Sequence, residues 1–80
     1  SEEPIKERLG LLKENDYYYY LEENETAEIY RLVAIDMNTA NLFSNYLNKQ
    51  VKVLGNESTI KENIKTIFVK DITLVATATE

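Results

Sequence analysis

Residues 17–20 are four consecutive tyrosines, and their side chains are the ones in this sequence best suited to bind a ligand. A phenol ring can stack on a nucleobase or a sugar ring, and its hydroxyl group can form a hydrogen bond. Successive side chains of a strand point to opposite faces, so Tyr18 and Tyr20 share one face. Tyr17 and Tyr19 share the other face with Leu21. The pattern leaves open which pair faces the core.

The exposed pair of tyrosines has two interpretations. In the first, the rings stack on the bases of an oligonucleotide while lysines follow its phosphates. In the second, the rings stabilise the sheet through cross-strand contacts, which is the interpretation we favour because small barrels commonly half-bury such rings. The candidate ligand-binding residues of the first interpretation are Tyr18, Tyr20, Tyr30, Lys49, Lys52, Lys65 and Lys70.

The charge balance argues against a strong interaction with nucleic acid. The chain has 14 acidic and 9 basic residues, a net charge of −5. Binding to phosphates needs a basic surface, but Glu57, Glu62 and Asp71 lie between the lysines in the sequence. A protein or a glycan is therefore the expected partner.

The residue types that are missing exclude most catalytic chemistry. The chain contains no cysteine and no histidine, so the usual zinc and iron–sulfur sites and the Ser–His and Cys–His pairs cannot form. With only two glycines, it also lacks the phosphate-binding loops of nucleotide cofactors. The glutamates of residues 22–28 match no calcium-binding loop. We expect no catalytic residues, no metal site and no cofactor, and hence no enzyme.

The length of 80 residues corresponds to one small domain. The longest apolar run, residues 17–21, is far too short to span a bilayer. The sequence does not begin with methionine, and we expect it to be part of a longer protein. The compartment stays open, because a lack of cysteine fits both an envelope protein and a cytosolic one.

Hydrophobic periodicity predicts three strands in the first half of the chain. Residues 5–13 place Leu9 and Leu11 on one face, and Lys6 and Arg8 on the other. Residues 17–21 follow after a tight polar turn, and residues 22–26 form the next loop. Residues 28–34 alternate in the same way and complete an antiparallel meander.

The pattern changes in the second half. Residues 38–49 have the apolar spacing of a helix, with possible N-caps at residues 36–39 and Asn48 in a left-handed conformation just past its end. Residues 50–55 form a fourth strand, residues 56–63 a polar connection, and residues 64–77 a long fifth strand. The apolar parity of this last strand changes near Lys70 and Asp71, which predicts a β-bulge there.

Three antiparallel strands, a short helix and two further strands are the element order of an OB-fold, a five-stranded Greek-key barrel with its helix between the third and fourth strands. We therefore expect a mainly β, OB-fold-like barrel over residues 1–80. An SH3-like small barrel is the main alternative, and the helix argues against it.

Several segments together resemble the small bacterial OB-fold domains of secreted and membrane-anchored envelope proteins: residues 10–12, 18–21, 30–32, 46–55 and 69–72. The resemblance implies a non-catalytic accessory or binding domain in the cell envelope or secreted, such as a piece of a larger lipoprotein. Three functions are compatible with the sequence: a domain that binds a protein or glycan, which we favour, an oligonucleotide-binding domain, and a structural module that packs against a neighbouring domain.

Overall fold

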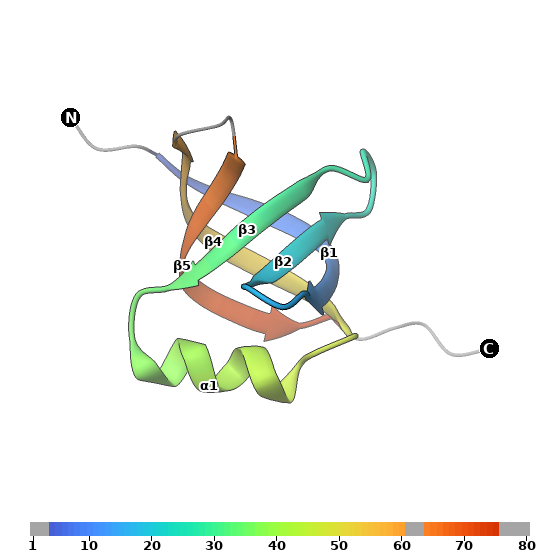
Figure 1. The fold of residues 1–80 in the computed structure, drawn as a ribbon, viewed down its shortest axis with the longest axis vertical. Helices are drawn as coiled ribbons and strands as arrows, with labels where there is room; N and C mark the ends of the chain where they lie inside the picture. The colour runs from blue at the N-terminus through green and yellow to red at the C-terminus, as the bar shows by residue number, and fades with distance from the viewer. Residues whose placement is uncertain (1–3, 61–63, 76–80) are drawn as a thin grey trace.

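Strand β1 (Ile5–Glu14) closes the barrel, because it pairs in antiparallel fashion with both β2 (Tyr19–Glu23) and β4 (Gln50–Ile60) (Figure 1). Strand β3 (Ile29–Ala34) pairs with β2 in antiparallel and with β5 (Ile64–Leu74) in parallel fashion. The strand order around the closed barrel is β1-β2-β3-β5-β4. The computed structural model describes residues 4–60 and 64–75 of the chain.

Helix α1 (Met37–Asn45) lies between β3 and β4 in the chain and covers one end of the barrel (Figure 1). The predicted mainly β fold is therefore confirmed as a closed five-stranded barrel with one short helix in this position. This architecture is consistent with both an OB-fold-like and an SH3-like small barrel. Within the described residues, no helix is long and apolar enough to cross a membrane.

The core consists of the inward-facing side chains of all five strands and one residue of the helix. Tyr30 and Leu32 of β3 alternate with exposed neighbours, as a strand with one buried face requires. Phe43 of α1 enters the barrel from its end. The buried apolar residues are Leu12, Leu21, Tyr30, Leu32, Phe43, Val51, Val53, Ile67, Val69 and Ile72.

Both predicted features at the ends of the helix are confirmed. Asp36 is the N-cap, and its carboxylate accepts a hydrogen bond of 2.8 Å from the backbone N–H of Thr39. Asn48 has a φ of 67°, and its N–H donates to the carbonyl of Leu12 at 2.7 Å. Asparagine tolerates this left-handed conformation better than most residues other than glycine, so the chain can turn from α1 into β4.

The β-bulge predicted near Lys70 and Asp71 is also confirmed. Leu54 pairs with Asp71, whereas the next residue, Gly55, pairs with Val69, so Lys70 is the extra residue. The bulge reverses the parity of β5. As a result Ile67 and Val69 before it and Ile72 after it all face the core.

The predicted orientation of β1 was wrong. Gly10 and Leu12 face inward, while Leu9 is 45% exposed, and half-buried Arg8 shares the inward parity. The apolar spacing of Leu9 and Leu11 suggested that their face is the buried one. The opposite face is buried instead, because Gly10 lies inward between β2 and β4. Gly10 leaves no room for a larger side chain, since a Cβ atom there would lie 2.3 Å from the carbonyl oxygen of Glu22.

Several predicted boundaries were also wrong. Residues 17 and 18 precede β2, and the predicted loop at residues 22 and 23 belongs to that strand. Residues 56–60 continue β4 instead of forming a polar connection, because they pair with residues 64–68 of β5. The helix ends before the predicted residue 49, and β5 ends before the predicted residue 77. The ends of two predicted segments, residues 61–63 and 76–77, lie outside the described residues.

Candidate binding face

The outer surface of β2, β3 and β5 carries two aligned rows of side chains. In the first row Tyr20 lies opposite Arg31, and Arg31 opposite Thr66. In the second row Val33 lies opposite Phe68. All these residues alternate with core residues in their strands, so they point away from the barrel interior.

Apolar side chains are exposed in the second row and at Ile29, which lies opposite Glu22 beside the first row. The exposed fractions are 45% for Ile29, 36% for Val33 and 37% for Phe68. Such side chains normally lie in a core or in an interface, so their grouping on three adjacent strands identifies a candidate binding surface. We call this surface the β2–β3–β5 face and define it by Tyr18, Tyr20, Ile29, Arg31, Val33 and Phe68.

The tyrosine run divides between this face and the core. Tyr18 and Tyr20 are half-buried on the outside, and their ring centroids are 6.3 Å apart in an edge-to-face arrangement. Tyr19 packs inward, with its ring centroid 5.2 Å from that of Phe43. Tyr17 is 88% exposed, because it lies in a turn where the side-chain oxygen of Asn15 accepts its N–H. The register left open by the sequence is thus the one with Tyr19 and Leu21 inside.

Arg31 lies at the centre of the β2–β3–β5 face and has no anionic partner in the part of the chain that the structure describes. Its Nε atom is buried and forms no hydrogen bond, and no ion pair to its guanidinium occurs among the described residues. Its cross-strand neighbour Thr66 points outward yet is fully buried, so neighbouring side chains cover it. Leaving a buried donor unpaired costs about 1–3 kcal/mol, and such a group in a native structure often has a functional reason.

Two lysines beside this face already have carboxylate partners. Lys13 Nζ is 2.9 Å from Glu22 Oε1, and Lys65 Nζ is 2.7 Å from Glu28 Oε1. The ion pair with Lys65, followed by the hydrogen bond donated by Tyr30, lowers the pKa of the Glu28 carboxyl group. Among the described residues, these pairs leave Arg31 as the positive charge in the middle of the face without a carboxylate partner.

A shallow hollow of about 340 Å³ runs over β3 and β5 next to Arg31. Its floor combines the two charged groups of the Lys65–Glu28 pair with apolar surface, and it is lined by Tyr18, Glu28, Ile29, Arg31, Ile64 and Lys65. A hollow this open suits the side chains of an extended partner better than an enclosed small molecule.

The structure brings only some of the predicted ligand-binding residues together. Tyr18, Tyr20 and Lys65 lie on or beside the β2–β3–β5 face. Tyr30 does not, because its ring is only 4% exposed and belongs to the core, so its predicted role as a stacking group was wrong.

The other three predicted lysines are not part of the β2–β3–β5 face. Lys52 lies on β4 between β1 and β5 and is 3.7 Å from Glu7, so it is on the side of the barrel away from β2 and β3. Lys49 is exposed just before β4, and Lys70 is exposed in the bulge. These lysines do not form the basic track that an oligonucleotide would need beside the tyrosines.

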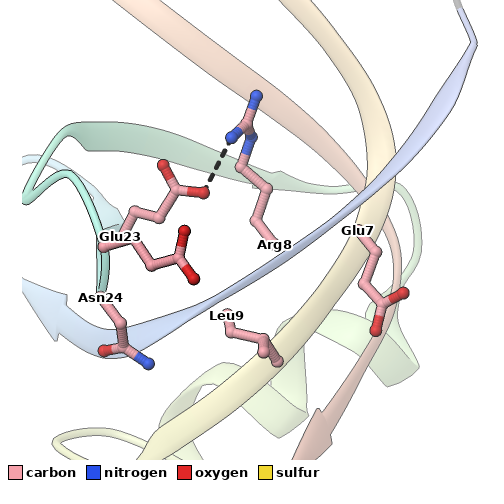
Figure 2. A pocket seen from close by; sticks show the side chains of 6 residues that line it. Glu7, Arg8, Leu9, Glu23 and Asn24 are labelled. Carbon is pink, nitrogen blue, oxygen red and sulfur yellow. Dashed lines mark hydrogen bonds and ion pairs between the residues drawn. The ribbon is translucent and has the colours of Figure 1, made fainter.

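A second pocket, of about 400 Å³, lies where β1 meets the end of β2 (Figure 2). Arg8 and Glu23 point toward one another across it, with 2.8 Å between Arg8 Nη1 and Glu23 Oε2 (Figure 2). Arg8 also donates to both carboxylate oxygens of Glu57, and its guanidinium carbon lies 4.6 Å from the centroid of the Tyr30 ring. This inward-facing network covers the core at the end of the barrel opposite α1.

The ionisable groups of this network are stabilised in their usual charge states. The hydrogen bonds to Glu57 raise the pKa of Arg8, although burial opposes them. Burial acts to raise the pKa of Glu23, but hydrogen bonds from Arg8 and Thr26 lower it overall. Burial, followed by the hydrogen bond to Glu28, raises the pKa of Tyr30 to about 12. A carboxylate that an arginine holds in its ionised form is a poor general acid. We therefore interpret the polar groups of this pocket as stabilising the barrel.

No family model, curated protein or solved structure matches this chain. The function therefore has to be argued from the geometry alone. The described residues also contain no group of three or more acidic residues, histidines or cysteines arranged to hold a metal ion.

The sequence reasoning missed the two most informative residues of the face, Arg31 and Phe68. The alternation of Ile29, Arg31 and Val33 against core residues was visible in the sequence and already placed Arg31 on an outer face. Its lack of an anionic partner was not visible, because that depends on which strands lie beside β3. The alternation of Phe68 with Ile67 and Val69 was visible as well, but its position opposite Val33 follows only from the parallel pairing of β3 with β5.

Proposed function

We propose that this chain is a non-catalytic, OB-fold-like binding domain that engages a protein partner through the β2–β3–β5 face. The observation that carries the proposal is the grouping of exposed Ile29, Val33 and Phe68 with half-buried tyrosines on the outside of β2, β3 and β5 of a closed barrel. In OB-folds, the face formed by the second and third strands is the usual ligand surface. The resemblance to bacterial envelope domains supports a secreted or membrane-anchored protein as its context.

The composition of the face favours a protein over a glycan. Sugar rings stack on aromatic side chains and need several hydrogen-bonding groups around them, whereas aliphatic side chains contribute little to such a site. Ile29 and Val33 are aliphatic and exposed at 45% and 36%, and Phe68 lies beside Val33. Mixed aliphatic and aromatic surface with a central arginine is typical of the core of a protein interface.

The absence of catalysis is supported by the state of the polar groups. Arg8 engages Glu23 in the pocket of Figure 2 and also binds Glu57. Its hydrogen bond helps to lower the pKa of Glu23, the opposite of the raised pKa that a general acid requires. The hollow beside Arg31 is shallow and lined mainly by apolar side chains and an existing ion pair.

The proposal can be tested by selecting a displayed library of random peptides on the domain. The variants are Val33→Asp, on the β2–β3–β5 face, and Leu9→Asp, a matched control on β1 whose leucine is 45% exposed. Both substitutions add one negative charge at an exposed apolar position, so neither should unfold the barrel, which circular dichroism will verify. We expect enriched peptides to bind the wild type and Leu9→Asp alike and to lose at least about tenfold in affinity for Val33→Asp.

Peptides that bind all three proteins equally would contradict the proposal. NMR titrations with short glycans and with single-stranded oligonucleotides form two further arms. Saturable shifts at Tyr18, Tyr20 and Phe68 with either ligand, in the absence of peptide binding, would replace the protein partner with that ligand. A face that binds nothing would instead favour packing against a neighbouring domain in a longer chain.

A further inference from the structure

The three outward positions of β3 form a simple chemical pattern. Ile29, Arg31 and Val33 follow one another at every second residue, so an apolar side chain lies on each side of the arginine. An extended peptide presents its own alternate side chains with nearly the same repeat of roughly 7 Å. A segment laid along β3 can therefore match these three positions one by one.

The charges around Arg31 determine which kind of side chain fits at the central position of such a segment. Lys13 and Lys65, which lie beside the row of Tyr20, Arg31 and Thr66, are neutralised by Glu22 and Glu28 at 2.9 and 2.7 Å. Lys70 lies farther along β5, beyond Phe68. Arg31 has no such partner among the described residues, and its Nε–H group is buried without an acceptor. On a chain with a net charge of −5, an uncompensated cation between apolar side chains is the exception.

We infer that Arg31 is the anchor for a carboxylate side chain of the partner, carried on an extended segment in which the acidic residue lies between two apolar residues at alternate positions. The guanidinium group has the planar fork that pairs with a carboxylate through two hydrogen bonds. Tyr20 lies opposite Arg31 on β2, and Tyr18 lines the same hollow as Arg31. The inference rests on the proposed function of the β2–β3–β5 face and specifies its partner.

The surroundings argue for a single carboxylate and against a chain of phosphates. A phosphate backbone needs several free cations in a line, but both lysines next to Arg31 are held by glutamates. One negative charge flanked by apolar groups is therefore the complementary ligand.

The test uses two capped peptides, acetyl-Val-Thr-Asp-Thr-Phe-amide and the same peptide with Asn in place of Asp. Their affinities for the domain are measured by NMR chemical-shift titration up to millimolar peptide. We expect the Asp peptide to bind about tenfold more tightly than the Asn peptide, because only the carboxylate forms a charged pair with the guanidinium. The largest shifts should fall on residues 29–33 and on Tyr20 and Phe68.

Two variants show whether Arg31 causes this preference. Arg31→Gln should reduce the affinity ratio of the two peptides to about one. Lys70→Gln removes the same charge at the exposed bulge residue and should leave the ratio unchanged. A ratio that falls equally in both variants would show a general effect of net charge and would overturn the inference.

The remaining outcomes separate this inference from the proposed function. Equal binding of both peptides to the wild type at the β2–β3–β5 face would overturn the role of Arg31 while leaving the face as a protein-binding surface. No shift with either peptide would also overturn it, and the library selection would then decide the function of the face independently. Shifts that depend on protein concentration in the absence of peptide would identify a second copy of the chain as the occupant.

Discussion

The two arginines of this small barrel have opposite environments. Arg8 points into the end of the barrel and is bound by Glu23 and Glu57, with the ring of Tyr30 beneath it. Arg31 lies on the outer face, where it has no acceptor for its buried Nε–H. A satisfied arginine contributes to stability, whereas an unsatisfied one is available to a partner. We therefore expect substitution of Arg8 to affect stability and substitution of Arg31 to affect the proposed binding.

The Arg8 network gives a prediction at the residue scale. Substitution Arg8→Met keeps most of the apolar stem but leaves Glu23 and Glu57 half-buried without a counter-ion. We expect the free energy of unfolding at pH 7 to fall by about 2 kcal/mol, less than for a fully buried pair because these side chains retain some exposure to water. Urea denaturation followed by circular dichroism measures this change.

The exposed ion pair of Lys52 with Glu7 provides the control. Its atoms are 3.7 Å apart and both side chains are about half exposed, so Lys52→Met should change the free energy of unfolding by no more than about 0.5 kcal/mol. Equal effects of Arg8→Met and Lys52→Met would show that the Arg8 network does not stabilise the end of the barrel.

At the scale of the elements, the barrel depends on close approaches of strands at two glycines. A Cβ atom at Gly10 in β1 would lie 2.3 Å from a backbone oxygen of β2, and one at Gly55 in β4 would lie 2.3 Å from a backbone oxygen of β5. Gly55 also lies directly at the register shift that accommodates Lys70. The bulge and the glycine together let β4 and β5 bend around the core.

Substitution Gly55→Ala should therefore be costly although it adds only one methyl group. The new atom would contact the Phe68 carbonyl oxygen and come within 2.8 Å of Ile67 Cγ2, so the two strands must move apart. We expect a loss of about 2–3 kcal/mol in the free energy of unfolding. Lys70→Ala, at the exposed bulge residue, should change it by less than about 0.5 kcal/mol. A tolerated Gly55→Ala would mean that β4 and β5 are less tightly apposed than the register indicates.

At the scale of the whole molecule, the paired carboxylates and the buried phenol determine how stability depends on pH. The pKa of Glu28 is lowered by Lys65, and that of Asp36 by the backbone and side-chain hydrogen bonds from Thr39. Tyr30 has its pKa raised to about 12 by burial. Unfolding would return these groups to ordinary values of about 4 for the acids and about 10 for tyrosine.

The free energy of unfolding decreases at acid pH and at alkaline pH for different reasons. Carboxyl groups with a lowered pKa in the folded state stabilise the fold above about pH 4 and lose that contribution as the pH falls further. Tyr30 stabilises the fold below about pH 10 and loses its contribution as the pH rises toward about 12. We expect the free energy of unfolding from urea titrations to be nearly level from pH 5 to 9 and to decrease on both sides.

Two conservative variants identify the groups responsible. Asp36→Asn keeps an N-cap acceptor but removes the titration, so it should flatten part of the acid limb. Tyr30→Phe should flatten the alkaline limb and remove the phenolate absorbance change with a midpoint of about 12. Unchanged limbs in both variants would assign the pH dependence to other groups.

Much of the architecture could be read from the sequence, because it is encoded by local patterns. Alternation identified β3 and its inward residues, the helical spacing located α1 with Asp36 and Asn48 at its ends, and the change of parity located the bulge at Lys70. Each of these signals depends only on the backbone geometry of one segment and on one apolar face.

The candidate site depended on contacts between segments, and so only the tertiary structure decided it. The inward orientation of Arg8 follows from Glu57, 49 residues away, which satisfies its charge at the end of the barrel. Tyr30 entered the core because the barrel closes over it. The predicted lysines were dispersed because Lys52 lies on β4, across the barrel from β2 and β3, while Lys65 lies near the start of β5 and Lys70 in its bulge. Arg31 became a candidate anchor only when the carboxylates of the adjacent strand β2, Glu22 and Glu23, proved to pair with Lys13 and Arg8, which left Arg31 without a partner among the described residues. A sequence specifies which side chains alternate, but the pairing of strands determines which charges meet.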